Sequence, residues 1–314
     1  MSPALPSRPA AAAQAASPEA IPPVPATAAY GRFRRHRLEF LCAGAVLLYV
    51  TVFIALPYAM VGVFSFWKKS LYTIRPAFSL ANYAQALGSD VYATVIGNSL
   101  IVATAVTLVA GVLGYVLAYY LAMYARRSRN LLFFLLVVPL WTSFLLRAYI
   151  WTIILGREGI LNTLLLRMGL VHQPLSLLLY NKFSICLALI YIFLPFVALP
   201  VYAALEKIPR SYIEASRDLG APPASTFRHV IFPLTVPGLV AGATVVFCLS
   251  FGDFITPKLL GGSSDIMIAN VIIEQFGAAF NWPFGSALAI VVLVVVFALL
   301  GMAAMLARLT GQSR

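Results

Sequence analysis

The chain has 314 residues, of which 61% are hydrophobic and 10% are charged, and its mean hydropathy is +0.92. Soluble domains carry about a quarter charged residues, so this composition excludes an ordinary water-soluble monomer. In a soluble protein the net charge of +12 would point to nucleic acid. Here the basic residues lie between apolar runs, which is typical of membrane topology. We therefore expect membrane lipid, and no nucleic acid, around this chain.

Residues 1–30 form an Ala- and Pro-rich tail with few large apolar side chains. Such a segment cannot bury enough surface to offset chain entropy, so we predict that it is disordered. It lacks the basic start and apolar core of a cleavable signal peptide. Residues 31–314 are predicted to form one transmembrane domain.

Six apolar runs are long enough to cross a bilayer, which takes roughly 20 residues at about 1.5 Å per residue. Pro57, Pro139, Pro195 and Pro200 fall inside these runs, where each removes a helical hydrogen bond and favours a kink. Neighbouring helices must satisfy the freed carbonyl groups. The sequence therefore predicts an all-α membrane protein built as a packed bundle of six spans. The predicted spans are Phe40–Phe64, Val95–Met123, Leu131–Leu155, Phe183–Leu205, Val230–Phe254 and Phe284–Leu306.

Lys and Arg residues flank the spans unevenly, and positively charged loops are retained in the cytoplasm. With the amino terminus inside, thirteen of the 22 basic residues lie on the inner side and seven on the outer side. Arg147 falls within a span, and Arg8 lies in the remote tail. This bias predicts that both termini are cytoplasmic. The inner residues are Arg32, Arg34, Arg35, Arg37, Arg126, Arg127, Arg129, Lys207, Arg210, Arg217, Arg228, Arg308 and Arg314.

The most polar stretch outside the tail lies between the fourth and fifth spans, on the predicted inner side. Pro209 suits a first helical turn, Gly220 suits the left-handed position after a helix end, and Pro222 and Pro223 prevent continuation. The spacing predicts a short helix over about 209–220. Such a helix either rests on the membrane surface or contacts a partner protein, and the spacing leaves both open. One face of it would carry Tyr212, Ala215, Ser216 and Leu219.

The same segment carries a motif. Glu214, Ala215 and Ser216 are followed after three residues by Gly220, and Pro233 comes further along. This run resembles the signature of ABC importer permeases, E-A-A-x3-G-x9-I-x-L-P. The departures are Ser216 for the second Ala, Val230 for Ile and Phe232 for Leu.

The resemblance implies the six-helix bundle of a type I importer permease in the cell inner membrane. In that family the loop is the cytoplasmic coupling helix, which docks on an ATP-hydrolysing subunit. The implied partners are an ATPase subunit dimer, a second permease subunit and an extracytoplasmic solute-binding protein. ATP and Mg would bind the ATPase subunits, and this chain would hold no cofactor. The implied coupling residues are Glu214, Ala215, Ser216, Gly220 and Pro233.

Further local runs are similar to the spermidine and putrescine importer permeases, and the likeness extends from about Phe40 to the end of the last span. It implies import of polyamines by alternating access. Related permeases of the same subfamily import other solutes, so another small solute remains open. The runs are Phe144–Trp151, Gly159–Asn162, Ser250–Gly262 and Asn281–Ser286.

A polyamine cation that leaves water needs carboxylates and aromatic faces along its route. Asp253 lies at the end of the fifth span between Phe251 and Phe254, and Glu274 follows in a mostly apolar outer segment. Both are candidate residues of a solute pathway. Alternatively, Asp253 bonds nearby backbone or Lys258, and Glu274 is a solvated loop charge.

Arg147 lies inside the third apolar run, where a charged side chain costs at least about 2.5 kcal/mol. We expect it to face a carboxylate, a group of carbonyls or water, with a role in gating or solute passage. Alternatively, its long side chain reaches the outer interface or forms a structural pair.

The sequence gives no sign of covalent chemistry. His36, His172 and His229 lie far apart, and neither an H-E-x-x-H run nor a G-x4-G-K-[ST] loop is present. The three cysteines are too dispersed for a disulfide framework or a metal site. We therefore expect no enzyme and no metal. The competing classes are an integral membrane enzyme and an ion-coupled secondary transporter, which would typically show two inverted halves.

Overall fold

The computed structural model describes residues 43–70, 73–125, 127–175 and 178–311. The predicted disordered tail, residues 1–30, lies outside the described residues. The chain divides into two units, Met1–Tyr58 and Ala59–Arg314. A helix over Ala43–Ser65 begins in the first unit, and it confirms that the first predicted span is helical over its described residues, 43–64.

The first span contains a local change of helix type. η1 (Thr51–Ala55) is a π-helical turn, and α2 (Leu56–Ser65) follows it directly. Pro57 lies just after the π turn, and proline cannot donate the next helical hydrogen bond. Wider turns of this kind commonly accommodate such an interruption.

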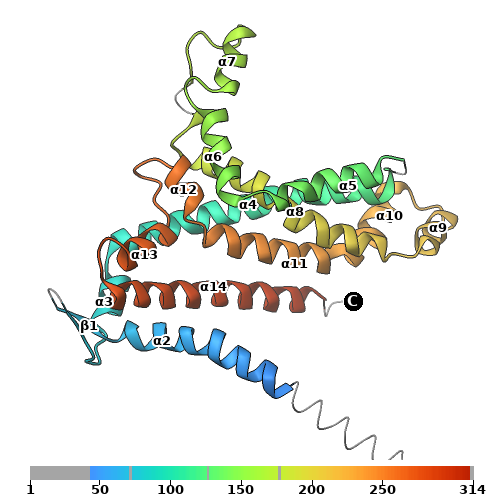
Figure 1. Ribbon diagram of the computed structural model, residues 1–314. Coiled ribbons are helices and arrows are strands. Elements are labelled where there is room, and N and C mark those ends of the chain that lie inside the picture. The colour runs from blue at the N-terminus through green and yellow to red at the C-terminus, as the bar shows by residue number, and fades with distance from the viewer. Residues whose placement is uncertain (1–42, 71–72, 126, 176–177, 312–314) are drawn as a thin grey trace, which may run out of the picture. The chain divides into compact units, whose positions relative to one another are not determined.

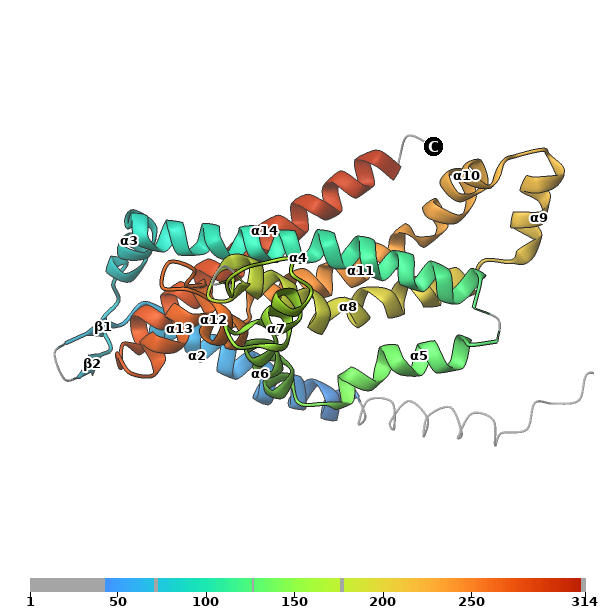
Figure 2. The same ribbon diagram turned by 90° about the horizontal axis from the view of Figure 1, so that it is seen from above.

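The second unit is built on three long helices that pack against one another, α4 (Asp90–Met123), α8 (Lys182–Glu206) and α11 (Phe232–Phe251) (Figure 1). Both views show α9 and α10 at one end of these helices and α12 and α13 at the other (Figures 1 and 2). The remaining elements are β1 (Lys68–Lys69), β2 (Ile74–Arg75), α3 (Ala81–Gly88), α5 (Arg129–Val137), η2 (Val138–Trp141), α6 (Phe144–Leu155), α7 (Ile160–Arg167), α9 (Arg210–Asp218), α10 (Pro223–Thr226), η4 (Phe227–Ile231), α12 (Ile255–Leu260), α13 (Ile268–Phe276) and α14 (Trp282–Gly311).

Five helices of the described chain are long and apolar enough to cross a membrane, and they match five of the six predicted spans. The fifth span ends at Phe251, three residues before the predicted end. The third span is different: Arg129–Trp141 and Phe144–Arg167 meet at a bend of 100°. The third predicted span, Leu131–Leu155, is therefore helical on both sides of a sharp bend, which lies beside Pro139, where the sequence predicts a kink.

The break in the third span has a local cause. After the 3-10 turn that contains Pro139, Thr142 adopts an extended conformation with ψ of 154°. The Pro139 carbonyl accepts both the Thr142 N–H at 3.2 Å and the Thr142 hydroxyl at 2.7 Å. Ser143 then precedes α6 in a non-helical conformation. Ser and Thr favour such breaks because their hydroxyl groups compete for nearby backbone groups.

The contact between α11 and α8 is close because α11 carries glycine there. A Cβ atom on Gly242 would lie 2.8 Å from the Val197 Cα and 2.9 Å from the Phe196 carbonyl oxygen. Four residues after Phe196 stands Pro200, which has no N–H to donate to that carbonyl. Gly238, one turn before Gly242, approaches the Pro200 carbonyl in the same way. Small residues at a spacing of four let two membrane helices approach at backbone distance.

Gly242→Ala is expected to destabilise the protein by about 1–3 kcal/mol, because the added methyl group meets the α8 backbone rather than a movable side chain. The measurement is the Tm of the purified protein. Gly111→Ala on α4 is the matched control, since nothing lies within 4 Å of its Cβ position. Equal Tm values for the two variants would contradict the close α8–α11 contact.

Candidate functional site

The short helix α9 ends as its sequence predicts. It runs from Arg210 to Asp218, and Gly220 follows with φ of +76°. The Gly220 N–H donates to the Arg217 carbonyl at 2.8 Å, and the Ala221 N–H donates to the Ser216 carbonyl at 3.1 Å. These two bonds form a Schellman motif, in which glycine takes the left-handed position without strain.

The prolines around α9 differ in detail from the expectation. Pro209 precedes the first helical turn instead of lying within it. Pro222 and Pro223 do end α9, but Pro223 also begins α10, the next helix. Proline is well suited to a first helical position because no N–H is needed there. Pro233, the last residue of the signature, lies near the start of α11.

One face of α9 is open and apolar. Tyr212 is 54% exposed and Leu219 is 87% exposed, and they line a depression of about 420 Å³. Another face holds α9 to the bundle, because Ile213 packs against the main hydrophobic core. The other residues that line the depression are Ala215, Ser216, Ala221 and Val230.

Ser216 joins α9 to α10. Its hydroxyl lies 3.0 Å from the hydroxyl of Thr226, and Thr226 is only 4% exposed. Alanine, which the signature has at this position, could not make this bond. Glu214 lies on α9 with its side chain exposed, and within the described residues it has no ion pair.

An ion pair at this end of the bundle had no signal in the sequence. Arg129, at the start of α5, forms a salt bridge with Glu206, at the end of α8. The Arg129 guanidinium also lies over the Tyr202 ring, 5.2 Å from its centroid. The pair ties the bent third span to α8 just before the α9 segment.

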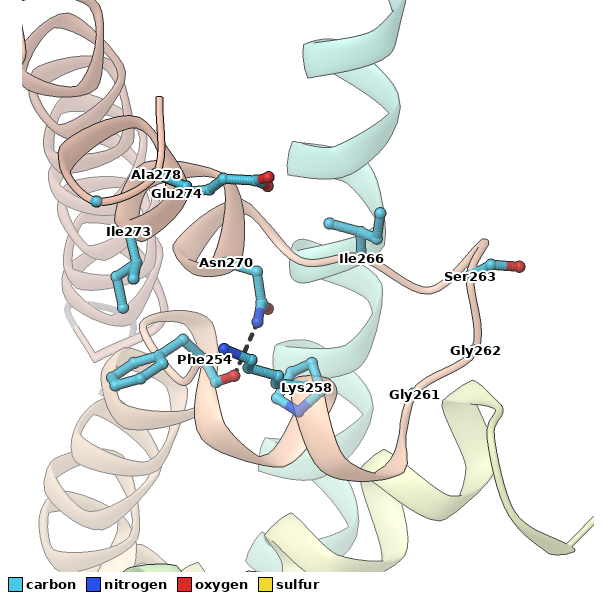
Figure 3. Close-up of a pocket in the computed structure, with 12 residues that line it drawn as sticks. Phe254, Lys258, Gly261, Gly262, Ser263, Ile266, Asn270, Ile273, Glu274 and Ala278 are labelled. Carbon is cyan, nitrogen blue, oxygen red and sulfur yellow. Dashed lines mark hydrogen bonds between the residues drawn. The ribbon is translucent and has the colours of Figure 1, made fainter. Parts of the chain in front are cut away.

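At the other end of the bundle, α12, α13 and the linker between them line a cavity of about 590 Å³ (Figure 3). Asn270 and Glu274 lie one turn apart on α13, and Lys258 lies on α12. The Asn270 amide donates to the Phe254 carbonyl at 2.8 Å. Its buried Oδ1 has no partner within the part of the chain that is described. The cavity therefore presents a carboxylate, an ammonium group and an aromatic ring.

Asp253 is not among the residues that line this cavity. It is buried, and its two carboxylate oxygens accept hydrogen bonds from the N–H groups of Ile255 at 3.2 Å and Thr256 at 3.1 Å. This is the geometry of the backbone-bonding alternative. The carboxylate fixes the start of α12, where the first N–H groups would otherwise have no acceptor.

Arg147 is 8% exposed, so its side chain is buried within the bundle. Its Nη1 donates to the Ile192 carbonyl at 3.3 Å, and the guanidinium lies 5.9 Å from the Phe144 ring centroid. Its Nε has no partner in the described part of the chain. The arrangement matches a carbonyl contact, and Arg147 does not join Glu274 in the cavity.

Hydrogen bonds from α4 and α8 fix the elements that form the cavity. Ser99 on α4 accepts the Ile268 N–H at 2.8 Å, at the start of α13. Ser184 on α8 donates to the Leu260 carbonyl at 2.8 Å, at the end of α12. The two short helices are therefore anchored to the long helices of the bundle.

The chain matches the family described as binding-protein-dependent transport system inner membrane component over residues 110–310. This chain belongs to that family. The matched region of the permease includes α9 with its glycine stop, the α8–α11 contact and the cavity. The permease is thus a multi-pass membrane protein.

Its relatives include the spermidine/putrescine transport system permease protein PotB of Salmonella typhimurium strain LT2, which is 38% identical over 79% of this chain and 86% of its own length. PotB of Escherichia coli K12 is 37% identical over 79% of this chain and 90% of its own length. The structure is similar, with a TM-score of 0.72 and 16% identity, to a chain of a bacterial alginate ABC transporter in complex with alginate pentasaccharide-bound periplasmic protein. That match covers 89% of the permease and 96% of the other chain. The fold is that of a type I ABC importer permease.

Sequence reasoning missed part of the cavity. The sequence suggested Lys258 only as a partner for Asp253, and Asn270 was not predicted to belong to a site. The spacing of Asn270 and Glu274, four residues apart in an apolar segment, is the signal that groups them on one helix face.

Ser216→Ala is expected to destabilise the permease by about 1 kcal/mol, because the buried Thr226 hydroxyl loses its side-chain partner. Thr226→Val in the same background should restore part of the loss, since both hydroxyl groups are then gone. The check is a double-mutant cycle of Tm values. Strictly additive effects would show that the two hydroxyl groups do not interact.

Proposed function

We propose that this permease is the transmembrane subunit of an ATP-driven importer that moves polyamines into the cytoplasm by alternating access. The observation that supports this most strongly is the exposed apolar face of α9, which Ile213 and the Ser216–Thr226 bond hold on the bundle. A surface of this kind on a fixed short helix suits a protein contact. The α9 face is the proposed docking site of an ATPase subunit.

In the proposed mechanism, closure of two ATPase subunits displaces α9. The displacement passes through η4 and α11 and through Glu206 into α8, and it reorients the far end of the bundle. Glu214, Ala215, Ser216, Gly220 and Pro233 would carry the coupling, as the resemblance implies. ATP and Mg²⁺ would bind the ATPase subunits, and hydrolysis would take place there.

The proposed assembly also contains a second permease subunit and an extracytoplasmic solute-binding protein. It would lie in the cell inner membrane with both termini of this chain in the cytoplasm, which agrees with the distribution of Lys and Arg. On that topology the α9 segment is cytoplasmic and the Glu274 cavity faces the outer side.

Polyamines are the proposed solute because the PotB relatives are named for spermidine and putrescine transport. The cavity adds chemical support, since Glu274 and the Phe254 ring can both hold an ammonium group. Its volume of about 590 Å³ is within the range of about 300–1,000 Å³ that is typical of small-molecule sites. Asp253 and Arg147 do not line this cavity and would influence solute passage indirectly. Asp253 would do so by fixing the start of α12, and Arg147 by fixing the contact of α6 with α8.

The test is uptake of labelled spermidine and putrescine by membrane vesicles that carry the whole importer. Uptake is expected to need ATP and to persist when ion gradients are dissipated. Glu214→Ala is expected to lower it about tenfold or more, equivalent to at least about 1.4 kcal/mol of coupling. Glu158→Ala, which removes an exposed carboxylate elsewhere, is the control. Uptake driven by an ion gradient without ATP would indicate a secondary transporter instead.

Gly220→Val is expected to uncouple uptake from ATP hydrolysis, because a β-branched residue is strained at positive φ and would distort the end of α9. Gly220→Asn is the matched variant, since asparagine tolerates the left-handed conformation. The rate of solute uptake and the rate of ATP hydrolysis are both measured in the assembled complex. If valine and asparagine had the same effect, the left-handed end of α9 would not be what matters.

A further inference from the structure

The Glu274 cavity also contains a cation of its own. Lys258 and Glu274 both line it and are both exposed. Neither side chain forms an ion pair or a hydrogen bond with another residue that the structure describes. Figure 3 shows Asn270 between Lys258 on one side and Glu274 on the other. A lysine is unexpected in a cavity that accepts a polycation, because like charges repel.

The chemistry of lysine gives this residue a specific role. Its side chain is a four-carbon stem with a terminal ammonium group, and putrescine is the same four-carbon stem with an ammonium group at each end. Groups that hold the solute can therefore hold Lys258 as well. These groups are the Glu274 carboxylate and the Phe254 ring.

The backbone around the cavity is fixed, whereas the lysine stem is not. The start of α12 is held by Asp253 and its end by Ser184. The start of α13 is held by Ser99. A lysine side chain is a flexible four-carbon stem with a compact charge, so the Lys258 ammonium can move within the cavity without a backbone change.

We propose that Lys258 is a tethered competitor for the solute. Its ammonium group shares the cavity with the Glu274 carboxylate, so it competes with an incoming polyamine for that carboxylate. Lys258 therefore lowers the affinity of the cavity for cations, and its return promotes release of the solute. This role rests on the proposed function, since a competitor of this kind requires a cationic solute.

The first test is the KM for putrescine uptake by vesicles that carry the complete importer. Lys258→Met keeps most of the stem but removes the charge, and it is expected to lower KM about tenfold, as removal of a nearby like charge should. In a Glu274→Gln background the same change should shift KM less than about twofold, because the shared site is gone. Lys68→Met, at an exposed lysine outside the cavity, is the control and should leave KM unchanged. An unchanged or raised KM in Lys258→Met, with normal uptake by the unaltered importer, would overturn the competitor and leave the proposed function intact.

The second test measures binding without transport. Ser263 lines the cavity, so Ser263→Cys, in a chain whose native cysteines are replaced by serine, reports access of a thiol reagent. Spermidine is expected to slow labelling at about tenfold lower concentration when Lys258→Met is added. If the importer took up no polyamine, the proposed solute would be wrong. The labelling measurement would still show whether Lys258 competes with a cation for the cavity. Equal protection in both variants, or none in either, would overturn the proposal.

Discussion

The close contact of α8 with α4 on one side and α11 on the other is the constraint on which the rest of the permease depends. Val197 of α8 lies at the centre of this contact. Its Cβ is 3.1 Å from the position that a Cβ of Gly114 on α4 would take, and its Cα is 2.8 Å from the position that a Cβ of Gly242 on α11 would take. Interiors that are this closely packed transmit displacement because they cannot be compressed. α8 is therefore held as a rigid element in the middle of the bundle.

Each end of α8 leads to one of the two candidate sites. At its start, Ser184 holds the end of α12 and so one wall of the Glu274 cavity. At its end, Glu206 binds Arg129 and is followed directly by the α9 segment. One helix thus connects the proposed docking surface for an ATPase with the cavity proposed for the solute. The two sites are separated along the bundle but share this element, which gives the proposed coupling a physical route.

Much of the fold follows from the sequence because each membrane span requires a long run of apolar residues. Apolar length predicted the five continuous spans, and the turn chemistry of glycine and proline predicted the end of α9 at Gly220. The sequence predicts a kink at Pro139 in the third span but not a bend of 100°, because the apolar run conceals it and the further signal is one polar pair, Thr142 and Ser143. That pair breaks the helix through a hydroxyl bond whose formation depends on the local backbone.

The candidate sites were less predictable than the spans. The coupling residues came from a motif, and their exposed face followed from helical spacing. The cavity depends on α12 and α13 folding back toward each other, and hydrogen bonds from Ser99 and Ser184, distant in sequence, fix that arrangement. For the same reason the pairing of Asp253 with backbone, rather than with Lys258, could be offered only as one alternative.

The most direct test is whether nucleotide bound at the α9 end changes the cavity at the far end of α8. The measurement is the labelling rate of Ser263→Cys in the assembled importer, with and without a non-hydrolysable ATP analogue. Coupling through α8 predicts that the analogue changes this rate. A rate that stays the same in an importer that binds the analogue would contradict the coupling.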